Sequence, residues 1–327
     1  MAGLIEKVMG ALGFGDSSEE VNPADYGYNL SKIRGVYENP TFEEAKFNDL
    51  IENFVTRDDD VFICTYVKAG TTWTQQIITL LLNGGDQGDK SYGEQCPWLE
   101  AATSEMLGPR EAPGHTLESI ATMDGPRFFK SHATLANLPR GRAPAPGLKV
   151  LYVARNPKDT VVSLYHHAKN KPEFGYTGDF KTFVELFLAG ACENGSWFSH
   201  VLDWWAESQR NPNVLFLKYE DMLADPAAAV ARIAEFCALD ASPAAVAKTV
   251  QNSSMKKMKE SAQANALAAF NHLRKGGSGG WKDSFTVATN ELFDQQRIIR
   301  RPQCTEPCQC VHGQPWACHG RVCICMY

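Results

Sequence analysis

Short runs of apolar residues alternate with helical patterns along the middle of the chain. Four runs have the length and composition of buried strands: Val61–Tyr66, Arg127–Lys130, Val150–Ala154 and Val214–Leu217. Helical patterns are found at Thr74–Leu82, Asp159–Lys169 and Ala227–Cys237. Asp225-Pro226 directly before the last pattern is a good N-cap followed by a first-turn proline. Strands that alternate with helices predict an α/β fold, with a central parallel sheet covered by helices on both faces.

The two ends of the chain differ from this pattern. Leu4, Ile5, Val8 and Leu12 share one helical face, and polar residues follow up to Glu20. We expect a loosely docked helix rather than a membrane-surface helix, because the polar face is poor in Lys and Arg. The pattern therefore divides the chain into an N-terminal extension (1–20), one main domain (21–300) and a C-terminal tail (301–327).

Composition limits the class of protein. The 327 residues are 44% hydrophobic and 21% charged, as in ordinary soluble globular proteins. No apolar run approaches the roughly 20 residues of a membrane-spanning helix. The net charge of −6 argues against a general nucleic-acid binder but permits a local basic pocket for a small anion. No signal peptide or myristoylation motif is recognised, and four scattered cysteines are typical of buried thiols, so we expect a cytoplasmic protein.

The first candidate for chemistry follows the first strand. In Lys68-Ala-Gly-Thr-Thr-Trp73, Gly70 permits close backbone approach, and the amides that open the next helix can bind an anion. The loop is similar to a nucleotide phosphate loop but lacks the glycine–lysine order of a Walker A sequence. A plain strand–helix turn with a surface lysine explains these residues equally well.

A second segment, Arg155-Asn-Pro-Lys-Asp-Thr-Val-Val-Ser163, repeats this layout. The strand ends in Arg155, which can hold a phosphate with two hydrogen bonds, and Pro157 opens a helix. Ser163 lies two turns beyond Asn156 and can face the same anion. The alternative is an arginine at the sheet edge and a serine facing solvent.

Two weaker candidates lie elsewhere. Arg274-Lys-Gly-Gly-Ser-Gly-Gly-Trp-Lys282 places two cations before a flexible loop that can fold over a phosphate, although a disordered basic linker has the same composition. Lys130-Ser-His132 ends the second strand, and His132 is the one histidine of eight at a strand end beside a lysine. A lone histidine is more often structural than catalytic.

Taken together, these segments resemble the cytosolic sulfotransferases in both order and spacing. The resemblance covers roughly residues 25–300 and includes Phe187-Leu-Ala-Gly190, Gly195-Ser-Trp197, Trp204-Trp205 and Tyr219-Glu-Asp-Met222. It implies a single doubly wound α/β domain with a phosphate-loop-like cofactor site. It also implies transfer of a sulfuryl group from 3′-phosphoadenosine 5′-phosphosulfate (PAPS) to a hydroxyl or amine of a small acceptor, without a metal.

The resemblance also implies roles for single residues. His132 corresponds to the general base, with Lys68 and Lys130 beside it. The loop at the 5′-phosphosulfate corresponds to Lys68, Ala69, Gly70, Thr71 and Thr72. The contacts to adenine correspond to Trp73, Tyr219 and Ser253. The residues around the 3′-phosphate correspond to Arg155, Ser163, Arg274, Lys275 and Gly276. A short dimerisation motif corresponds to Lys282, Thr286, Val287 and Glu291 and implies a homodimer.

The chain departs from the family pattern at three positions and in its tail. Val67 stands where the family usually has proline, Ala69 where it has serine, and Gly280 where it has aspartate. Beyond Asp294 the resemblance stops, and six of the ten cysteines crowd the last 24 residues. Their spacing, even with His312 and His319, fits no standard zinc finger, and a disulfide knot conflicts with a reducing cytosol. We expect an irregular tail, with zinc binding as the less favoured alternative.

Two other functions remain open from the sequence. A nucleotide kinase shares strand–loop–helix phosphate binding, but the Walker A order is absent and no magnesium-binding partner is evident. A catalytically impaired nucleotide-binding protein is the second alternative, given Gly280 and the altered C-terminus. For the acceptor pocket, we expect the loops Cys96–Leu99 and Phe174–Tyr176, whose aromatics indicate a flat or apolar acceptor; core packing explains them nearly as well.

Overall fold

A four-stranded parallel sheet forms the centre of the computed structural model. The model describes residues 20–104, 116–260, 276–299, 317–318 and 321–322. The strands of the sheet are β3 (Val61–Thr65), β4 (Phe128–Ser131), β5 (Lys149–Ala154) and β6 (Val214–Lys218). Their spatial order is β4-β3-β5-β6, and every pairing is parallel. All four predicted strands and the parallel sheet are confirmed.

Strand β3 shows why the strand runs are apolar throughout. Phe62 and Cys64 pack into one core cluster with residues of three helices, α6 (Pro157–Asn170), α7 (Phe180–Ala189) and α8 (Trp197–Ser208). Val61 and Ile63 pack into a second cluster with α3 (Thr71–Leu82) and α10 (Pro226–Phe236). Successive side chains of a strand point to opposite faces, so a sheet covered on both sides needs apolar residues at every position.

Two of the predicted helices, α6 (Pro157–Asn170) and α10 (Pro226–Phe236), begin at side-chain caps. Asn156 accepts a hydrogen bond from the Lys158 amide before Pro157 in α6, and Asp225 accepts one from the Ala228 amide before α10, as the sequence predicts. The helix predicted from Thr74 begins three residues earlier, because Gly70 adopts a positive φ of 113° and ends the loop there.

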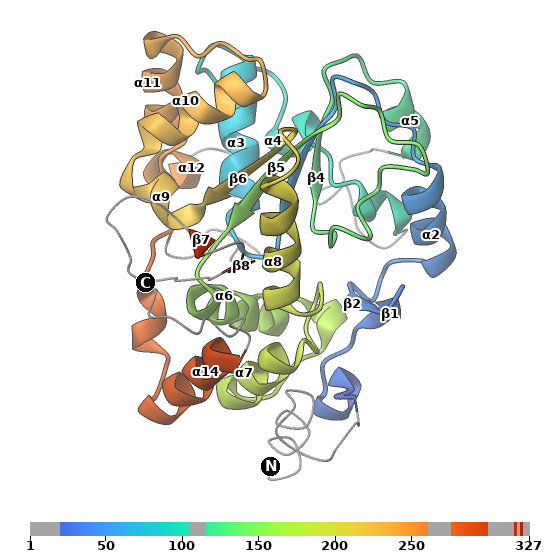
Figure 1. Cartoon of the computed structure of the whole chain (residues 1–327), viewed down its shortest axis with the longest axis vertical. Helices are drawn as coiled ribbons and strands as arrows, with labels where there is room; N and C mark the ends of the chain where they lie inside the picture. Colours follow the sequence, from blue (N-terminus) through green and yellow to red (C-terminus); the bar gives the residue numbers. More distant parts are fainter. Residues whose placement is uncertain (1–19, 105–115, 261–275, 300–316, 319–320, 323–327) are drawn as a thin grey trace.

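Figure 1 shows α6, α7 and α14 grouped at one end of the molecule and α10 and α11 at the other. The helices that cover the sheet or extend from it are α3 (Thr71–Leu82), α6 (Pro157–Asn170), α7 (Phe180–Ala189), α8 (Trp197–Ser208), α9 (Tyr219–Ala224), α10 (Pro226–Phe236), α11 (Pro243–Asn252), α12 (Met255–Glu260) and α14 (Val287–Ile299). Smaller helical elements are η1 (Pro23–Tyr26), α2 (Glu44–Asn53), α4 (Tyr92–Gln95), η2 (Glu100–Thr103), α5 (Leu117–Ala121), η3 (Pro172–Phe174) and η4 (Gly280–Asp283).

Two short antiparallel pairs lie outside the main sheet. One is β1 (Ser31–Ile33) with β2 (Val36–Glu38), and the other is β7 (Ala317–Cys318) with β8 (Arg321–Val322). The second pair lies in the C-terminal tail, whose irregular character stays a prediction. The predicted N-terminal helix and the rest of the tail fall outside the described residues.

The strand order places a topological switch point between β3 and β5. From β3 the chain continues to β4 on one side, and β5 then lies on the other side of β3. In open α/β sheets, ligands bind beyond the carboxyl ends of the strands at such a point. The loops after β3 and β5 carry Lys68 and Arg155. The topology therefore brings the two predicted anion-binding segments to one place.

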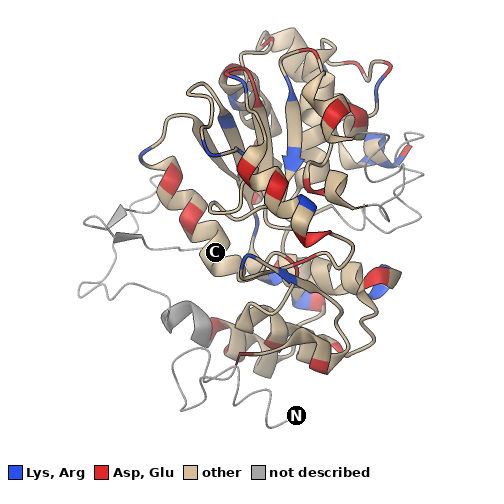
Figure 2. Cartoon of the chain, turned by 90° about the vertical axis from the view of Figure 1, so that its right-hand side faces the viewer, with Lys and Arg blue, Asp and Glu red and all other residues tan. Residues whose placement is uncertain are grey.

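Charged residues are dispersed over the outside. Figure 2 shows Lys and Arg interspersed with Asp and Glu on the face drawn, with acidic bands on several helices. Within the part of the chain that the structure describes, none of the helices combines the length and apolarity needed to span a bilayer.

Candidate active site

The loop between β3 and α3 is shaped to hold an anion. Lys68 adopts a left-handed conformation with φ of 69°, a conformation that L residues seldom adopt and that is frequent at functional sites. Gly70 is required as well, because a Cβ there would lie 2.7 Å from the Tyr219 ring. Gly70 is the N-cap of α3 and provides no side-chain cap, so the first amides of this long helix remain available to a ligand.

Arg155 connects this loop to the glycine-rich loop. Its Nη1 donates to the Lys68 carbonyl at 3.1 Å, and its Nη2 donates to the Gly277 carbonyl at 2.9 Å. The guanidinium packs over the Tyr219 ring, 4.6 Å from the centroid. Its Nε is buried and has no hydrogen-bond partner among the described residues. A buried donor without a partner fits a site that a phosphate oxygen completes.

Asp159, in the first turn of α6, holds the glycine-rich loop in place through hydrogen bonds to its backbone. Its carboxylate accepts hydrogen bonds from the Gly279 amide at 2.7 Å and the Trp281 amide at 3.0 Å. We did not predict this residue, although it lies in the helix that directly follows Arg155. The loop is thus tied to α6 without a carboxylate at position 280, where the family usually has aspartate.

His132 is held in one orientation at the end of β4. Its Nδ1 lies 3.0 Å from the Thr65 carbonyl, an acceptor, so Nδ1 carries the proton and Nε2 is free to accept one. Its backbone amide donates to the Glu100 carboxylate at 3.1 Å. Burial, followed by the charge of Lys130, lowers the pKa of His132 well below its usual value, so the ring is neutral near pH 7.

Burial also changes the two lysines nearest the histidine. It lowers the pKa of Lys68 to about 7, with repulsion from Lys130 as the second cause. It lowers the pKa of Lys130 to about 8, although Glu100 opposes the shift. The Lys130 ammonium lies 3.8 Å from the centroid of the Trp98 ring. Both cations are therefore poorly solvated and favour an anionic ligand.

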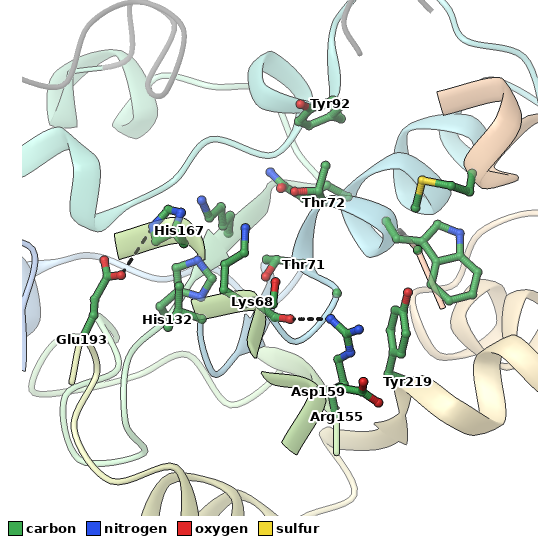
Figure 3. Close-up of a pocket in the computed structure, with 18 of the residues that line it drawn as sticks. Lys68, Thr71, Thr72, Tyr92, His132, Arg155, Asp159, His167, Glu193 and Tyr219 are labelled. Carbon is green, nitrogen blue, oxygen red and sulfur yellow. Dashed lines mark hydrogen bonds and ion pairs between the residues drawn. The ribbon is translucent and has the colours of Figure 1, made fainter. Parts of the chain in front are cut away.

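These residues surround one cavity of about 320 Å³ (Figure 3). Eleven of the predicted site residues line it: Lys68, Gly70, Thr71, Thr72, Trp73, Lys130, His132, Arg155, Ser163, Tyr219 and Gly276. Ala69 and Ser253 are buried beside it but are not part of its lining. Arg274 and Lys275 lie outside the described residues. Figure 3 shows His132 toward one end of the cavity and Arg155 with Tyr219 toward the other.

The end of the cavity near His132 differs from the prediction. Trp98 lines the cavity as expected, but Phe174 and Tyr176 are buried in the core and do not. Polar side chains line this end instead; those we had not predicted are Asn39, His167, Lys171 and Glu193. They come from three separate segments, one with Asn39, one with His167 and Lys171, and one with Glu193. No sequence motif in these segments indicates that their side chains line a cavity.

The described residues contain no cluster of three or more His, Cys, Asp or Glu side chains arranged to hold a metal ion. The fold and the site together define an enzyme that transfers a group from an anionic nucleotide. Cationic loops lie at a topological switch point, and a neutral histidine faces them.

Comparison with known proteins identifies the family. The model of the "Sulfotransferase domain" family matches residues 58–298. Sulfotransferase 1A1 of Bos taurus is 36% identical over 266 residues, covering 78% of this chain and 87% of the relative. Sulfotransferase 1B1 of Canis lupus familiaris is 34% identical over 291 residues, covering 84% and 94%. The chain belongs to the sulfotransferase family.

Solved structures agree with this assignment. The crystal structure of mouse sulfotransferase SULT7A1 complexed with PAP has a TM-score of 0.68 and 28% identity, covering 83% of this chain and 94% of that one. The structure of retinol dehydratase in a complex with retinol and PAP has a TM-score of 0.67 and 25% identity, covering 86% and 94%. The predicted family and fold are confirmed, and the family assignment does not support the kinase alternative.

Proposed function

We propose that this sulfotransferase moves a sulfuryl group from PAPS to a hydroxyl or amine of a small acceptor, with His132 as the general base. Two similar solved structures hold PAP, which is PAPS without its sulfuryl group. The observation that carries the proposal is that Lys68, Arg155 and His132 line one cavity.

The nucleotide end of the cavity fits two separated anionic groups. We assign the 5′-phosphosulfate to the loop of Lys68, Ala69, Gly70, Thr71 and Thr72, in which the Ala69 amide donates to the Tyr66 carbonyl at 3.1 Å and so holds the turn of the loop. We assign the 3′-phosphate to Arg155, Ser163, Arg274, Lys275 and Gly276. We assign the adenine to Trp73 and Tyr219, whose rings meet edge to face with centroids 5.5 Å apart, and to Ser253.

The other end performs the proton transfer. The Thr65 carbonyl keeps the proton of His132 on Nδ1, so Nε2 accepts the proton of the acceptor hydroxyl. The acceptor oxygen forms a bond to sulfur while the bond from sulfur to the phosphate oxygen breaks, and the electron pair stays on PAP. Lys68 and Lys130 stabilise the charge on the sulfuryl and leaving oxygens.

Replacement of the base tests the proposal. With His132→Ala we expect kcat for phenol sulfation to fall by roughly 10²- to 10⁴-fold, the usual contribution of general base catalysis. Labelled PAPS and a panel of phenols, alcohols and amines give the rates, and calorimetry gives the affinity for PAP. Affinity for PAP stays near that of the wild type, because His132 lies at the end of the cavity away from Arg155.

His166→Ala is the matched control, since His166 lies on α6 outside the cavity lining. Transfer at an unchanged rate in His132→Ala contradicts the assignment of the base. A wild-type protein that binds PAP but transfers nothing to any of the acceptors supports the impaired nucleotide-binding protein instead.

We also propose a homodimer through Lys282, Thr286, Val287 and Glu291, and a cytoplasmic location. Val287 is 76% exposed, so its side chain is accessible to a second copy of the chain. Four cysteines of the described part of the chain are free and buried: Cys64, Cys96, Cys192 and Cys237. Free thiols are typical of proteins in a reducing compartment.

A further inference from the structure

The acceptor end of the cavity carries ionisable groups that the proposed transfer does not use. His167 lies on α6, Lys171 directly follows this helix, and Glu193 lies in the loop between α7 and α8. Figure 3 shows His167 and Glu193 on the same side of the cavity as His132. A cavity built for a purely apolar acceptor does not need buried charges here, because each of them costs desolvation energy.

Glu193 is the least satisfied of these groups. Its side chain is 3% exposed, and its Oε2 has no hydrogen-bond partner in the described part of the chain. His167 Nε2 lies 3.6 Å from Oε2, a contact drawn as a dashed line in Figure 3; this is within ion-pair range but too long for a hydrogen bond. Burial lowers the pKa of His167 in spite of the nearby carboxylate, so His167 is neutral near pH 7 and does not cancel the charge of Glu193. A buried carboxylate oxygen in a ligand cavity is thus left for a donor from the ligand.

The cations at this end have other partners. The Lys171 ammonium lies 3.5 Å from the Glu173 carboxylate. Lys68 and Lys130 face the position that we assign to the sulfuryl group, and Glu193 lines the same cavity on the side of His132. With these cations engaged, Glu193 is the group that remains to select the acceptor.

We propose that Glu193 binds a second hydrogen-bond donor of the acceptor, an ammonium or a hydroxyl group, while the reacting hydroxyl faces His132. The proposal rests on the sulfotransferase function proposed above and narrows its acceptor class to phenols or alcohols with a further donor. A flat apolar acceptor, which the aromatic loops of the sequence indicate, leaves Glu193 without a partner.

Three matched phenols test the proposal: 4-ethylphenol has no second donor, 4-(2-hydroxyethyl)phenol has a neutral donor, and 4-(2-aminoethyl)phenol has a cationic donor. The affinity of each for the enzyme–PAP complex is measured by calorimetry, and kcat/KM is measured with PAPS. We expect both donor phenols, or the cationic one alone, to be preferred over 4-ethylphenol by roughly tenfold or more, the usual effect of a hydrogen bond to a charged group.

Glu193→Gln keeps the shape of the side chain and removes its charge. We expect the preference for the cationic phenol to fall at least tenfold in this variant, and the preference for the neutral donor to fall less, because the glutamine carbonyl still accepts. Glu185→Gln is the matched control, since Glu185 is equally buried and lies on α7 outside the cavity lining; its Oε1 has no hydrogen-bond partner and lies 3.4 Å from the Lys181 ammonium.

Three outcomes overturn the proposal: no preference for donor phenols in the wild type, an unchanged preference in Glu193→Gln, or an equal loss in Glu185→Gln. A wild type that prefers 3-(4-hydroxyphenyl)propanoate over both donor phenols also overturns it, because the cations then select the acceptor. If the binding preference is present and sensitive to Glu193 but no sulfate is transferred, the proposal stands and the proposed function fails.

Discussion

At the scale of single residues, the buried lysines make nucleotide binding depend on pH. The pKa of Lys68 is about 7 and that of Lys130 about 8 because burial disfavours their charged forms. An anionic nucleotide favours the charged forms and raises both values again. Lys68 is mostly neutral in the free protein above pH 7, so binding has to take up protons there.

We therefore expect PAP binding at pH 8.5 to take up between about one and two protons, and affinity to fall as pH rises from 7 to 9. The phosphates of PAP, with a second pKa of about 6, are already fully ionised and contribute little. Calorimetry in buffers of different ionisation enthalpy measures the uptake. Lys68→Met should lower the uptake by about one proton, whereas proton release by the wild type would contradict the explanation.

The same shifts act on stability with a defined sign. The folded pKa of Lys68 lies below the usual value of about 10.4 for an unfolded chain, so the unfolded chain binds more protons between pH 7 and 10. The lysine thus destabilises the free protein at neutral pH, and this penalty decreases as pH rises through that window. Binding of the anionic nucleotide offsets it.

At the scale of elements, helix α6 organises the nucleotide end. Arg155, just before its N-cap, contacts the loop after β3, and Asp159 in its first turn holds the glycine-rich loop. Met255 at the start of α12 packs against the same loop, since a Cβ at Gly276 would come within 2.2 Å of its side chain. The short stretch Arg155–Asp159 therefore contacts both the loop after β3 and the glycine-rich loop.

Removal of the Asp159 carboxylate should release the glycine-rich loop. With Asp159→Ala we expect the Kd for PAP and the KM for PAPS to rise at least tenfold, with a smaller change in kcat, because two charge-assisted hydrogen bonds to loop amides are lost. Asp159→Asn keeps one carbonyl acceptor and should recover part of the affinity.

Asp294→Ala is the control for this variant. Asp294 on α14 pairs with Lys158, which lies next to Asp159 on α6, at 2.6 Å. The Asp294 side chain is 41% exposed and has no hydrogen bond to the glycine-rich loop. Its replacement should leave the Kd for PAP within about twofold, in line with the small contribution of exposed ion pairs. Equal losses in both variants would indicate damage to α6 rather than release of the loop.

At the scale of the whole molecule, the proposed dimer depends on an exposed apolar side chain at the start of α14. We expect Val287→Glu to convert a particle of twice the chain mass into a monomer, as measured by light scattering coupled to size-exclusion chromatography. Val55→Glu is the control, because Val55 is equally exposed, at 77%, and lies far from this segment in the sequence. A wild-type protein that is monomeric at all concentrations contradicts the proposal.

The strands, the parallel sheet and the meeting of Lys68, Arg155 and His132 at one cavity were predictable from local sequence. Uninterrupted apolar runs indicate strands buried on both faces, and residues at parallel strand ends must meet at one edge of the sheet. Lys68, Arg155 and His132 each follow a strand directly, so strand positions alone brought them together. Helix ends were predictable where Asn156 and Asp225 act as caps.

The acceptor end was decided by the tertiary structure. Phe174 and Tyr176 have the composition of pocket residues but pack into the core, and Glu193, His167 and Asn39 reach the cavity from separate segments. Asp159 was likewise missed, because its partners lie about 120 residues away in the sequence. Periodicity and spacing report on neighbours within an element or at a shared strand edge. Which distant side chains meet in a cavity depends instead on how whole elements pack, and only the folded chain contains that information.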